Sequence, residues 1–233
     1  MFEAVYFDAF NTLFSMRVPG LSRSRRMPMQ KGRLSSIMHQ YDARLQALYG
    51  RVHAGVEPAP NRFTRFLAAV ADRTGVSTTG PYGLLLRPDW LIRYLLSVYT
   101  DVLSTLQALN QVCSLGVISN AWPQMDRILD LLGIRHYFDS VTISAKVGLS
   151  KPNPAIYELA LRNLGISADQ AIFVDDMPYN VAAAESMGLR ALWLVRAVVA
   201  EASIPAQYRG LTRIQSLDQV VAMALGSRHY APA

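Results

Sequence analysis

The stretch "EAVYFDAFNTLF" at residues 3–14 joins a short apolar run directly to a single carboxylate, that of Asp8. An apolar run of this length without polar alternation is typical of a parallel strand that is buried on both faces. Similar runs occur further along the chain, namely "SLGVIS" (114–119), "SVTIS" (140–144), "AIFV" (171–174) and "RALWLV" (190–195). These runs predict a buried parallel sheet in which residues 3–7 form one strand.

Helical patterns separate the later runs. "PQMDRILDLLG" has apolar residues at 125, 128, 129 and 132, and "YNVAAAESMGL" predicts a helix that ends near Gly188. "NPAIYELALRNLG" begins with Asn153 as an N-cap and Pro154 at the first helical position, and it ends at Gly165. Strands alternating with helices predict an α/β fold, a doubly wound parallel sheet with right-handed crossovers. The tail "LTRIQSLDQVVAMAL" predicts a last short strand and an amphipathic helix.

The segment from 15 to 100 has a different character. It begins with a basic loop, continues with helical patterns at 34–52, 61–75 and 88–99, and contains no comparable strand. We therefore expect a Rossmann-like core made of residues 1–14 and 101–233, with residues 15–100 inserted as an α-helical cap domain.

The net charge of +6 is concentrated in one part of that segment. Residues 17–33 contain no acid, and their basic residues equal the whole excess: Arg17, Arg23, Arg25, Arg26, Lys31 and Arg33. A solvated loop is the first interpretation, because prolines, glycines and serines are interspersed, and steering of an anion is the second. Nucleic-acid binding ranks last, since the aromatic residues of a single-strand binding surface are missing there. The expected partner is a small anionic substrate.

Several classes of protein are disfavoured by the remaining composition. No run of about 18 apolar residues is free of charge, and "MFEAVYFDAF" has acids where a signal peptide carries basic residues. We therefore expect a cytoplasmic protein, monomeric or homodimeric, with no membrane partner. Cys113 is the single cysteine, which rules out an internal disulfide and favours a small buried hydrophobe.

Polar residues cluster where the predicted strands end. Each could be a helix cap or a solvated side chain when taken alone: Asp8, Ser119, Asn120, Lys151, Asp175 and Asp176. The carboxyl ends of parallel strands meet at one edge of a sheet, which is where ligands bind in such folds. Converging carboxylates repel one another and raise their pKa values. A divalent cation with oxygen ligands is therefore expected between them, and we predict Mg²⁺.

Four segments, in this order and spacing, resemble the motifs of the haloacid dehalogenase-like hydrolase superfamily. They are "FDAFNTL", "VISN", "KPNPAIY" and "FVDDMPYNVAAAESMG". The helical insertion after the first motif resembles the first type of cap in that superfamily. The resemblance covers nearly the whole chain.

The resemblance implies a role for each polar residue. Asp8 is the nucleophile, Thr12 is the closing threonine of the first motif, Ser119 and Asn120 bind the transferred group, and Lys151 neutralises its charge. Asp8, Asp175, Asp176 and the carbonyl of Phe10 serve the magnesium site.

Phe10 departs from the pattern of the family's phosphatases, which have a second aspartate there as acid and base. Phenylalanine keeps the backbone carbonyl but lacks the acid. General acid–base catalysis is worth roughly a hundred- to ten-thousand-fold in rate. Its loss should be felt most with poor alkoxide leaving groups.

A 2-haloacid dehalogenase is the first alternative, since halide leaves without a proton and those enzymes have an aromatic residue at the position of Phe10. They are metal-independent, however, and their fourth motif differs: this chain has Asp175 and Asp176 at their serine positions and Asn180 at their aspartate. They also need an arginine from the cap, for which Arg44 and Arg51 are guesses. We therefore expect a Mg²⁺-dependent phosphatase of a small phosphorylated metabolite, with a non-catalytic binding protein as the second alternative.

Overall fold

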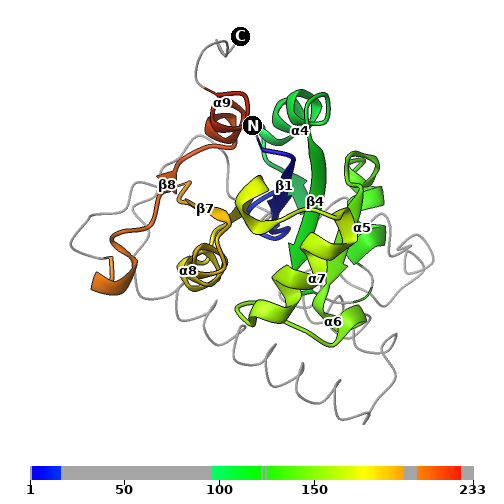
Figure 1. Cartoon of the computed structure of the whole chain (residues 1–233). Coiled ribbons are helices and arrows are strands. Elements are labelled where there is room, and N and C mark those ends of the chain that lie inside the picture. Colours follow the sequence, from blue (N-terminus) through cyan, green and yellow to red (C-terminus); the bar gives the residue numbers. More distant parts are fainter. Residues whose placement is uncertain (1, 17–95, 122, 124, 197–203, 227–233) are drawn as a thin grey trace, which may run out of the picture. The chain divides into compact units, whose positions relative to one another are not determined.

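The computed structural model describes residues 2–16, 96–121, 123, 125–196 and 204–226 (Figure 1). Most of the predicted cap, with its basic segment, its helices at 34–52 and 61–75, and Arg44 and Arg51, lies outside the described residues. The boundaries of the predicted cap domain therefore stay a prediction.

The described part of the chain contains a six-stranded parallel sheet in the order β5-β4-β1-β6-β7-β8. Its strands are β1 (Ala4–Phe7), β4 (Ser114–Ser119), β5 (Ser140–Ile143), β6 (Ala171–Asp175), β7 (Arg190–Leu194) and β8 (Arg213–Ile214). All five predicted runs and the predicted tail strand are confirmed, within one residue at each end for the runs. After β5 the chain crosses to the other side of β1, so the direction of winding reverses beside β1. Ligands of doubly wound sheets bind at this reversal.

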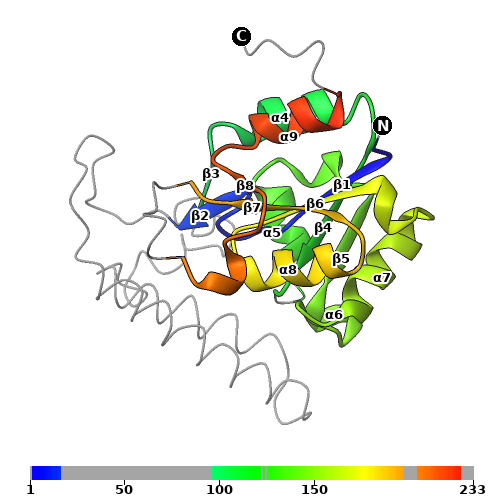
Figure 2. The same ribbon diagram turned by 60° about the vertical axis from the view of Figure 1, so that its left-hand side comes forward.

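Helices lie on both faces of the sheet. Helices α4 and α9 pack together on one side, and α7 and α8 lie on the other (Figures 1 and 2). The bounds are α4 (Val102–Leu109), α5 (Met125–Leu131), α6 (Ser144–Val147), α7 (Pro154–Leu164), α8 (Pro178–Ser186) and α9 (Asp218–Ala224). Short 3₁₀ turns occupy η2 (Arg135–Tyr137), η3 (Ala168–Gln170) and η5 (Ala206–Tyr208).

Helix α7 has the ends that its sequence predicts. The Asn153 side chain accepts a hydrogen bond from the backbone N–H of Ala155, and Pro154 opens the helix. Gly165 ends it in the left-handed conformation at φ 69°, which glycine adopts at low cost. The chain is thereby fixed directly after the loop that carries Lys151.

One prediction is wrong at the edge of the cap. The helical pattern at 88–99 predicts a helix, and no strand is expected between 15 and 100, yet Leu96–Val98 form strand β3. This strand pairs antiparallel with β2 (Phe14–Met16). A short apolar run such as "LLSVY" fits the periodicity of a helix and that of a strand equally well. Here the pairing with β2 selects the strand. The two described ends of the predicted cap therefore lie side by side.

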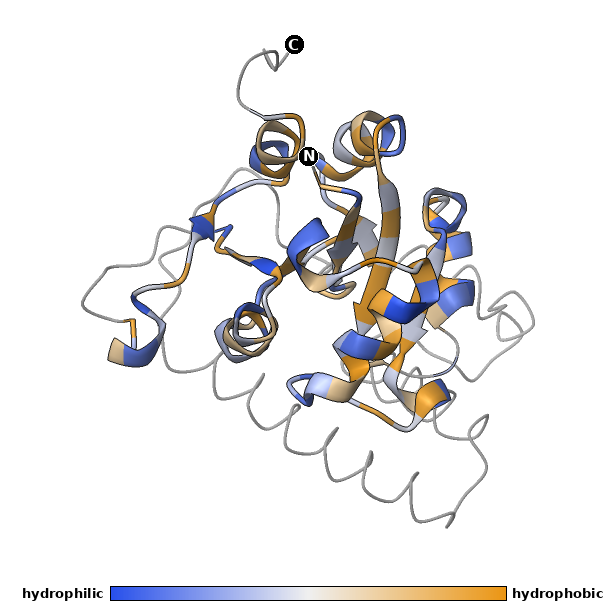
Figure 3. Ribbon diagram, in the orientation of Figure 1, coloured by the Kyte–Doolittle hydropathy of each residue, from blue (hydrophilic) through white to orange (hydrophobic). Residues whose placement is uncertain are grey.

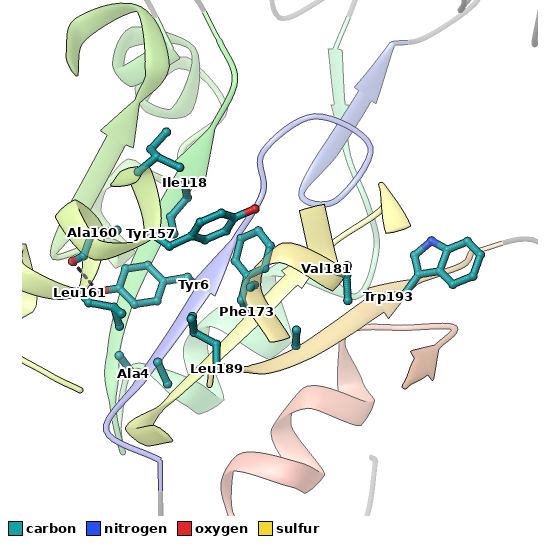
Figure 4. Close-up of a cluster of buried hydrophobic side chains, with 14 of the residues drawn as sticks. Ala4, Tyr6, Ile118, Tyr157, Ala160, Leu161, Phe173, Val181, Leu189 and Trp193 are labelled. Atoms are coloured by element: carbon teal, nitrogen blue, oxygen red, sulfur yellow. Dashed lines mark hydrogen bonds between the residues drawn. The ribbon is translucent and has the colours of Figure 1, made fainter. Parts of the chain in front are cut away.

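Buried hydrophobic residues occur on both faces of the sheet, and one cluster of them lies between the sheet and helices α7 and α8. Hydropathy is high along much of the central strands, whereas the helices carry both hydrophobic and hydrophilic residues (Figure 3). The Tyr6 ring lies across Gly116, where a Cβ atom would come within 2.4 Å of two ring carbons. Its hydroxyl donates to the carbonyl of Ala160 at 2.7 Å (Figure 4). This close packing joins β1, β4 and α7 beneath the edge that carries Asp8.

Candidate active site

Strands β1 and β6 bring the predicted acids together. They are parallel neighbours with Phe7 opposite Val174, so Asp8 and Asp175 leave the sheet at the same edge. The backbone N–H of Asp8 donates to the carbonyl of Val174 at 2.8 Å. Carboxylate oxygens of Asp8, Asp175 and Asp176 lie within 4.8 Å of one another. The convergence predicted from the strand ends is confirmed.

Lys151 completes this acid cluster, which we define as Asp8, Asp175, Asp176 and Lys151. Its Nζ atom lies 2.6 Å from Asp8 Oδ1 and 2.6 Å from Asp175 Oδ2. Only 3% of the residue is exposed. One ammonium group therefore holds two carboxylates in place, and the backbone N–H of Ala9 adds a hydrogen bond to the carboxylate of Asp8.

The side chain of Asn120 holds the backbone of Lys151. Its Oδ1 accepts from the Lys151 N–H at 2.8 Å, and its Nδ2 donates to the Lys151 carbonyl at 2.8 Å. Asn120 therefore braces the lysine, a use that the sequence did not reveal. Its predicted role in binding the transferred group stays a prediction.

Asp175 is fixed by two further hydrogen bonds. Its Oδ1 accepts from the Met177 N–H at 2.7 Å, and its Oδ2 accepts from Asn180 Nδ2 at 3.0 Å. The carbonyl of Asn180 accepts in turn from the Tyr157 hydroxyl at 2.9 Å. Sequence reasoning missed Asn180 as a member of the site. The available signal was a short amide residue in the first turn of the helix that directly follows the paired acids.

The acid cluster is short of positive charge. Burial raises the pKa of Asp8 to about 6, although the attraction of Lys151 opposes this. Burial, followed by repulsion from Asp8 and Asp175, also raises the pKa of Asp176 well above its ordinary value. Burial alone would lower the pKa of Lys151, but the attraction of Asp175 and Asp8 outweighs it, and the net shift is upward. Three carboxylates around one ammonium, all offering oxygen atoms, fit a divalent cation such as Mg²⁺.

Comparison with known proteins identifies the family. Residues 91–194 match the family model described as haloacid dehalogenase-like hydrolase. A glyceraldehyde 3-phosphate phosphatase from Methanopyrus kandleri is 30% identical over 158 residues, covering 58% of this chain and 67% of that protein. The chain belongs to the haloacid dehalogenase-like hydrolases.

Other relatives of this hydrolase match over shorter stretches. A phosphoserine phosphatase from Thermus thermophilus is 35% identical over 36% of this chain and 34% of its own length. The (S)-2-haloacid dehalogenase 2 from Pseudomonas sp. is 29% identical over 42% of this chain and 44% of its own. The matches to these two relatives span less than half of their lengths. Relatives of both kinds, phosphatase and dehalogenase, therefore resemble this hydrolase.

Solved structures confirm the fold. A HAD phosphatase from Thermococcus onnurineus has a TM-score of 0.58 at 21% identity and covers 97% of this chain and 99% of that one. An L-2-haloacid dehalogenase from Xanthobacter autotrophicus, with chloropropionic acid covalently bound, has a TM-score of 0.66 at 20% identity. It covers 98% of this chain and 100% of that chain. At such identities the likeness concerns the fold alone.

The remaining predicted site residues of the hydrolase lie at the end of β4 and in the loop that follows Asp8. Ser119 is the buried last residue of β4, the strand beside β1. Thr12 is fully buried, and its hydroxyl has no hydrogen-bond partner among the described residues. Phe10 is half-buried, and its ring meets that of Phe14 edge-on at 5.8 Å between centroids. An aromatic pair therefore occupies the position where the resemblance leads one to expect an acid.

Asn11 connects the loop that follows Asp8 to the acid cluster. It has a left-handed backbone at φ 62°, a conformation in which asparagine is enriched among non-glycine residues. Its side chain interacts with Asp176, and against the larger upward effect of burial this interaction lowers the pKa of that carboxyl group. Among the described residues, no helix has the length and apolar character needed to span a membrane.

Proposed function

We propose that this hydrolase is a Mg²⁺-dependent phosphatase that acts on a small phosphorylated metabolite through an aspartyl intermediate at Asp8. The observation that supports this most is the buried cluster of three carboxylates around a single lysine. A dehalogenase needs no such surplus of acids, whereas a phosphatase needs a cation to offset the charge of the phosphoryl oxygens. The phosphatase-named relatives support the same choice.

In the proposed reaction, a carboxylate oxygen of Asp8 attacks phosphorus in line with the leaving oxygen, and the Asp8–phosphate bond forms as the bond to the leaving group breaks. Lys151 holds Asp8 in position through its Oδ1 atom. Asp8, Asp175, Asp176 and the Phe10 carbonyl would hold Mg²⁺, which supplies positive charge to the transferring group. Ser119 and Asn120 are the proposed contacts to that group, and Thr12 closes the loop. A water, or a group from cap or substrate, replaces the missing acid at the leaving group. Water then cleaves the acyl phosphate, which releases inorganic phosphate and regenerates Asp8.

Phe10 sets the expected substrate preference. It cannot protonate a leaving alcohol, so substrates whose leaving group needs little protonation should react best. We expect acyl and aryl phosphates to be hydrolysed much faster than alkyl phosphates. The proposal therefore includes the kind of phosphate ester as well as the reaction.

Two variants at position 10 test this preference. Phe10→Asp should raise alkyl phosphate turnover specifically, roughly a hundredfold if the carboxylate is well placed. Phe10→Asn is the matched control, because it makes the same change of size without an acid and should give no such gain. Steady-state rates on both substrate classes, with and without Mg²⁺, measure the effect. Equal gains in both variants would contradict the assigned acid–base defect.

A 2-haloacid dehalogenase is the second candidate, favoured by the aromatic residue at position 10 and by the similar Pseudomonas enzyme. The two reactions separate in one assay. A dehalogenase releases halide from 2-chloropropionate without Mg²⁺, and a phosphatase does not. Halide release that is lost in Asp8→Asn would overturn the first choice.

The basic residues at 17–33 extend the proposal to substrate capture. Their six cations would attract an anionic substrate, and salt would weaken that attraction. We expect kcat/KM for a phosphate ester to fall as ionic strength rises. The triple replacement of Arg23, Arg25 and Arg26 by glutamine should flatten this salt dependence. If the triple variant has the same dependence of kcat/KM on ionic strength as the parent, the basic residues do not steer the substrate and the stretch is only a solvated loop.

A further inference from the structure

One arginine outside the acid cluster joins three separate parts of the chain. Arg196, two residues after β7, donates from Nη1 to Asp101 at 2.8 Å (Oδ2) and 3.1 Å (Oδ1). Its Nη2 donates to the carbonyl of Thr12 at 2.8 Å. The guanidinium group lies over the Tyr99 ring at 3.8 Å from the centroid. A single planar group therefore contacts both the loop after Asp8 and the segment that follows β3.

The partner carboxylate is itself held in place. Asp101 Oδ2 also accepts from the backbone N–H of Leu217, the residue before α9, at 2.9 Å. The side chains of Asp101 and Arg196 are 10% and 21% exposed. A shielded pair of this kind is screened less by salt than a surface pair. Arg196 therefore pairs with a carboxylate, that of Asp101, which is itself held in place by the backbone.

Arg196 links the loop from Ala9 to Leu13 to the end of β7. Its local hydrogen bonds, from Leu13 N–H to Ala9 O at 2.9 Å and from Asn11 N–H to Phe14 O at 2.7 Å, close the loop on itself. The Tyr99 N–H adds a bond to Leu13 O at 3.1 Å, which ties the loop to the end of β3. Arg196 then fixes both to the end of β7. A displacement of this loop would reach Asp176 through Asn11 and would move the Phe10 carbonyl.

We infer that Arg196 is a positioning residue: it holds the loop after Asp8 and the returning strand β3 as one unit against the end of β7. For its kinetic consequence this inference rests on the proposed phosphatase function. Arginine is required because its planar group pairs with a carboxylate through two bonds, reaches a carbonyl and stacks on an aromatic ring at once. Lysine keeps the charge but cannot make all of these contacts.

Arg135 provides a matched control. Its Nε donates to Asp126 at 2.9 Å and its Nη1 donates to the Phe138 carbonyl at 2.7 Å, so it also joins a carboxylate and a backbone carbonyl. Its side chain is 33% exposed. It lies in the connection between α5 and β5 and has no part in the proposed chemistry.

The kinetic test compares Arg196→Ala, Arg196→Lys and Arg135→Ala with the parent, at a temperature well below all of their melting points. Misplacement of reacting groups by about 1 Å can cost about a hundredfold in rate, so we expect kcat on an aryl phosphate to fall about 10- to 100-fold in Arg196→Ala, with a smaller change in KM. Arg196→Lys should remain severalfold below the parent. Added guanidinium ion should partly restore kcat in Arg196→Ala, and Arg135→Ala should keep the parent kcat.

Hydrogen exchange tests the clamp without relying on turnover. Amides in 9–16 and 96–101 should exchange at least severalfold faster in Arg196→Ala than in the parent and in Arg135→Ala. Parent-like exchange in either segment, or a parent-like kcat in Arg196→Ala, overturns the inference. A parent that hydrolyses no phosphate refutes the proposed function, and the exchange comparison then decides on the clamp by itself.

Discussion

Two charged clusters in this hydrolase contrast in balance and burial. The acid cluster places one lysine beside three carboxylates; Asp8, Asp175 and Lys151 are buried and Asp176 is half-buried. The surface cluster, which we define as Asp126, Arg135 and Lys146, surrounds one carboxylate with two cations that are 33% and 43% exposed. The pKa of Asp8 is raised, whereas that of Asp126 is lowered, because its hydrogen bonds to Lys146 and Arg135 outweigh partial burial.

The contrast distinguishes the proposed active site from an ordinary structural ion pair. The surface cluster compensates its carboxylate in full and needs no further ligand. The acid cluster retains an excess of buried negative charge, which costs stability unless something positive binds. Matched substitutions in the two clusters can therefore separate function from ordinary ion pairing.

The largest effect is expected from the nucleophile. Asp8→Asn should lower aryl phosphate turnover at least about a thousandfold, because an amide oxygen cannot form the acyl phosphate. Asp126→Asn makes the same chemical change in the surface cluster and should leave turnover unchanged. Initial rates in saturating Mg²⁺ measure both. A comparable loss of turnover in the two variants would contradict the proposed catalytic role of the acid cluster.

Removal of a lysine should have unequal effects on stability. Lys151→Gln leaves buried carboxylates without their cation and should lower the free energy of unfolding in metal-free buffer by about 3–5 kcal/mol. Lys146→Gln should cost less than about 1 kcal/mol, as is usual for exposed pairs. Urea denaturation measures both values. Saturating Mg²⁺ should recover part of the Lys151→Gln loss, and equal losses in the two variants would contradict this interpretation.

Magnesium affinity should depend on one cluster alone. Asp175→Asn should weaken Mg²⁺ binding more than about tenfold, since even outer contacts of a metal site are worth 10–100-fold in affinity. Titration calorimetry measures the change, and Asp126→Asn serves as the control. The parent should also melt at a higher temperature in Mg²⁺, because a ligand that binds the folded state stabilises it. No heat of Mg²⁺ binding in the parent would refute the predicted metal site.

The smallest effect concerns the pH dependence of the surface cluster. The folded-state pKa of Asp126 lies below its ordinary value of 3.8, so its contribution to stability is present above 3.8 and is lost as pH falls through the folded-state pKa. Asp126→Asn should therefore cost about 0.5 kcal/mol at neutral pH and nothing in strong acid. Thermal melts across this range would reveal the change. A difference that persists in acid would point to packing and not to charge.

The sheet and the acid cluster could be predicted because each has a recognisable pattern within a short stretch of sequence. Buried parallel strands are nearly continuous apolar runs, and the residues that follow them must meet at one edge. Asp8, Lys151, Asp175 and Asp176 were therefore predictable as a group. Strand β3 was not, because a run as short as "LLSVY" has no decisive period without its partner β2.

The bracing contacts could not be predicted, for a different reason. Asn120 contacts Lys151 across 31 residues, and Arg196 contacts Asp101 across 95. The sequence around a single arginine that follows a strand does not indicate which distant residue it will contact. Such pairs depend on how the strands are ordered in space, and that order is known only from the assembled sheet.

The pairing of Phe14–Met16 with Leu96–Val98 bears on how such an enzyme can acquire new substrates. The residues that flank the intervening 17–95 are held side by side by this strand pair. A longer or shorter replacement would then add only slowly growing closure entropy, about 0.6 kcal/mol for each doubling of length. The residues proposed for the chemistry all lie outside that stretch. Evolution, or a protein engineer, can therefore replace this stretch to select for new specificity while the residues proposed for the chemistry stay unchanged.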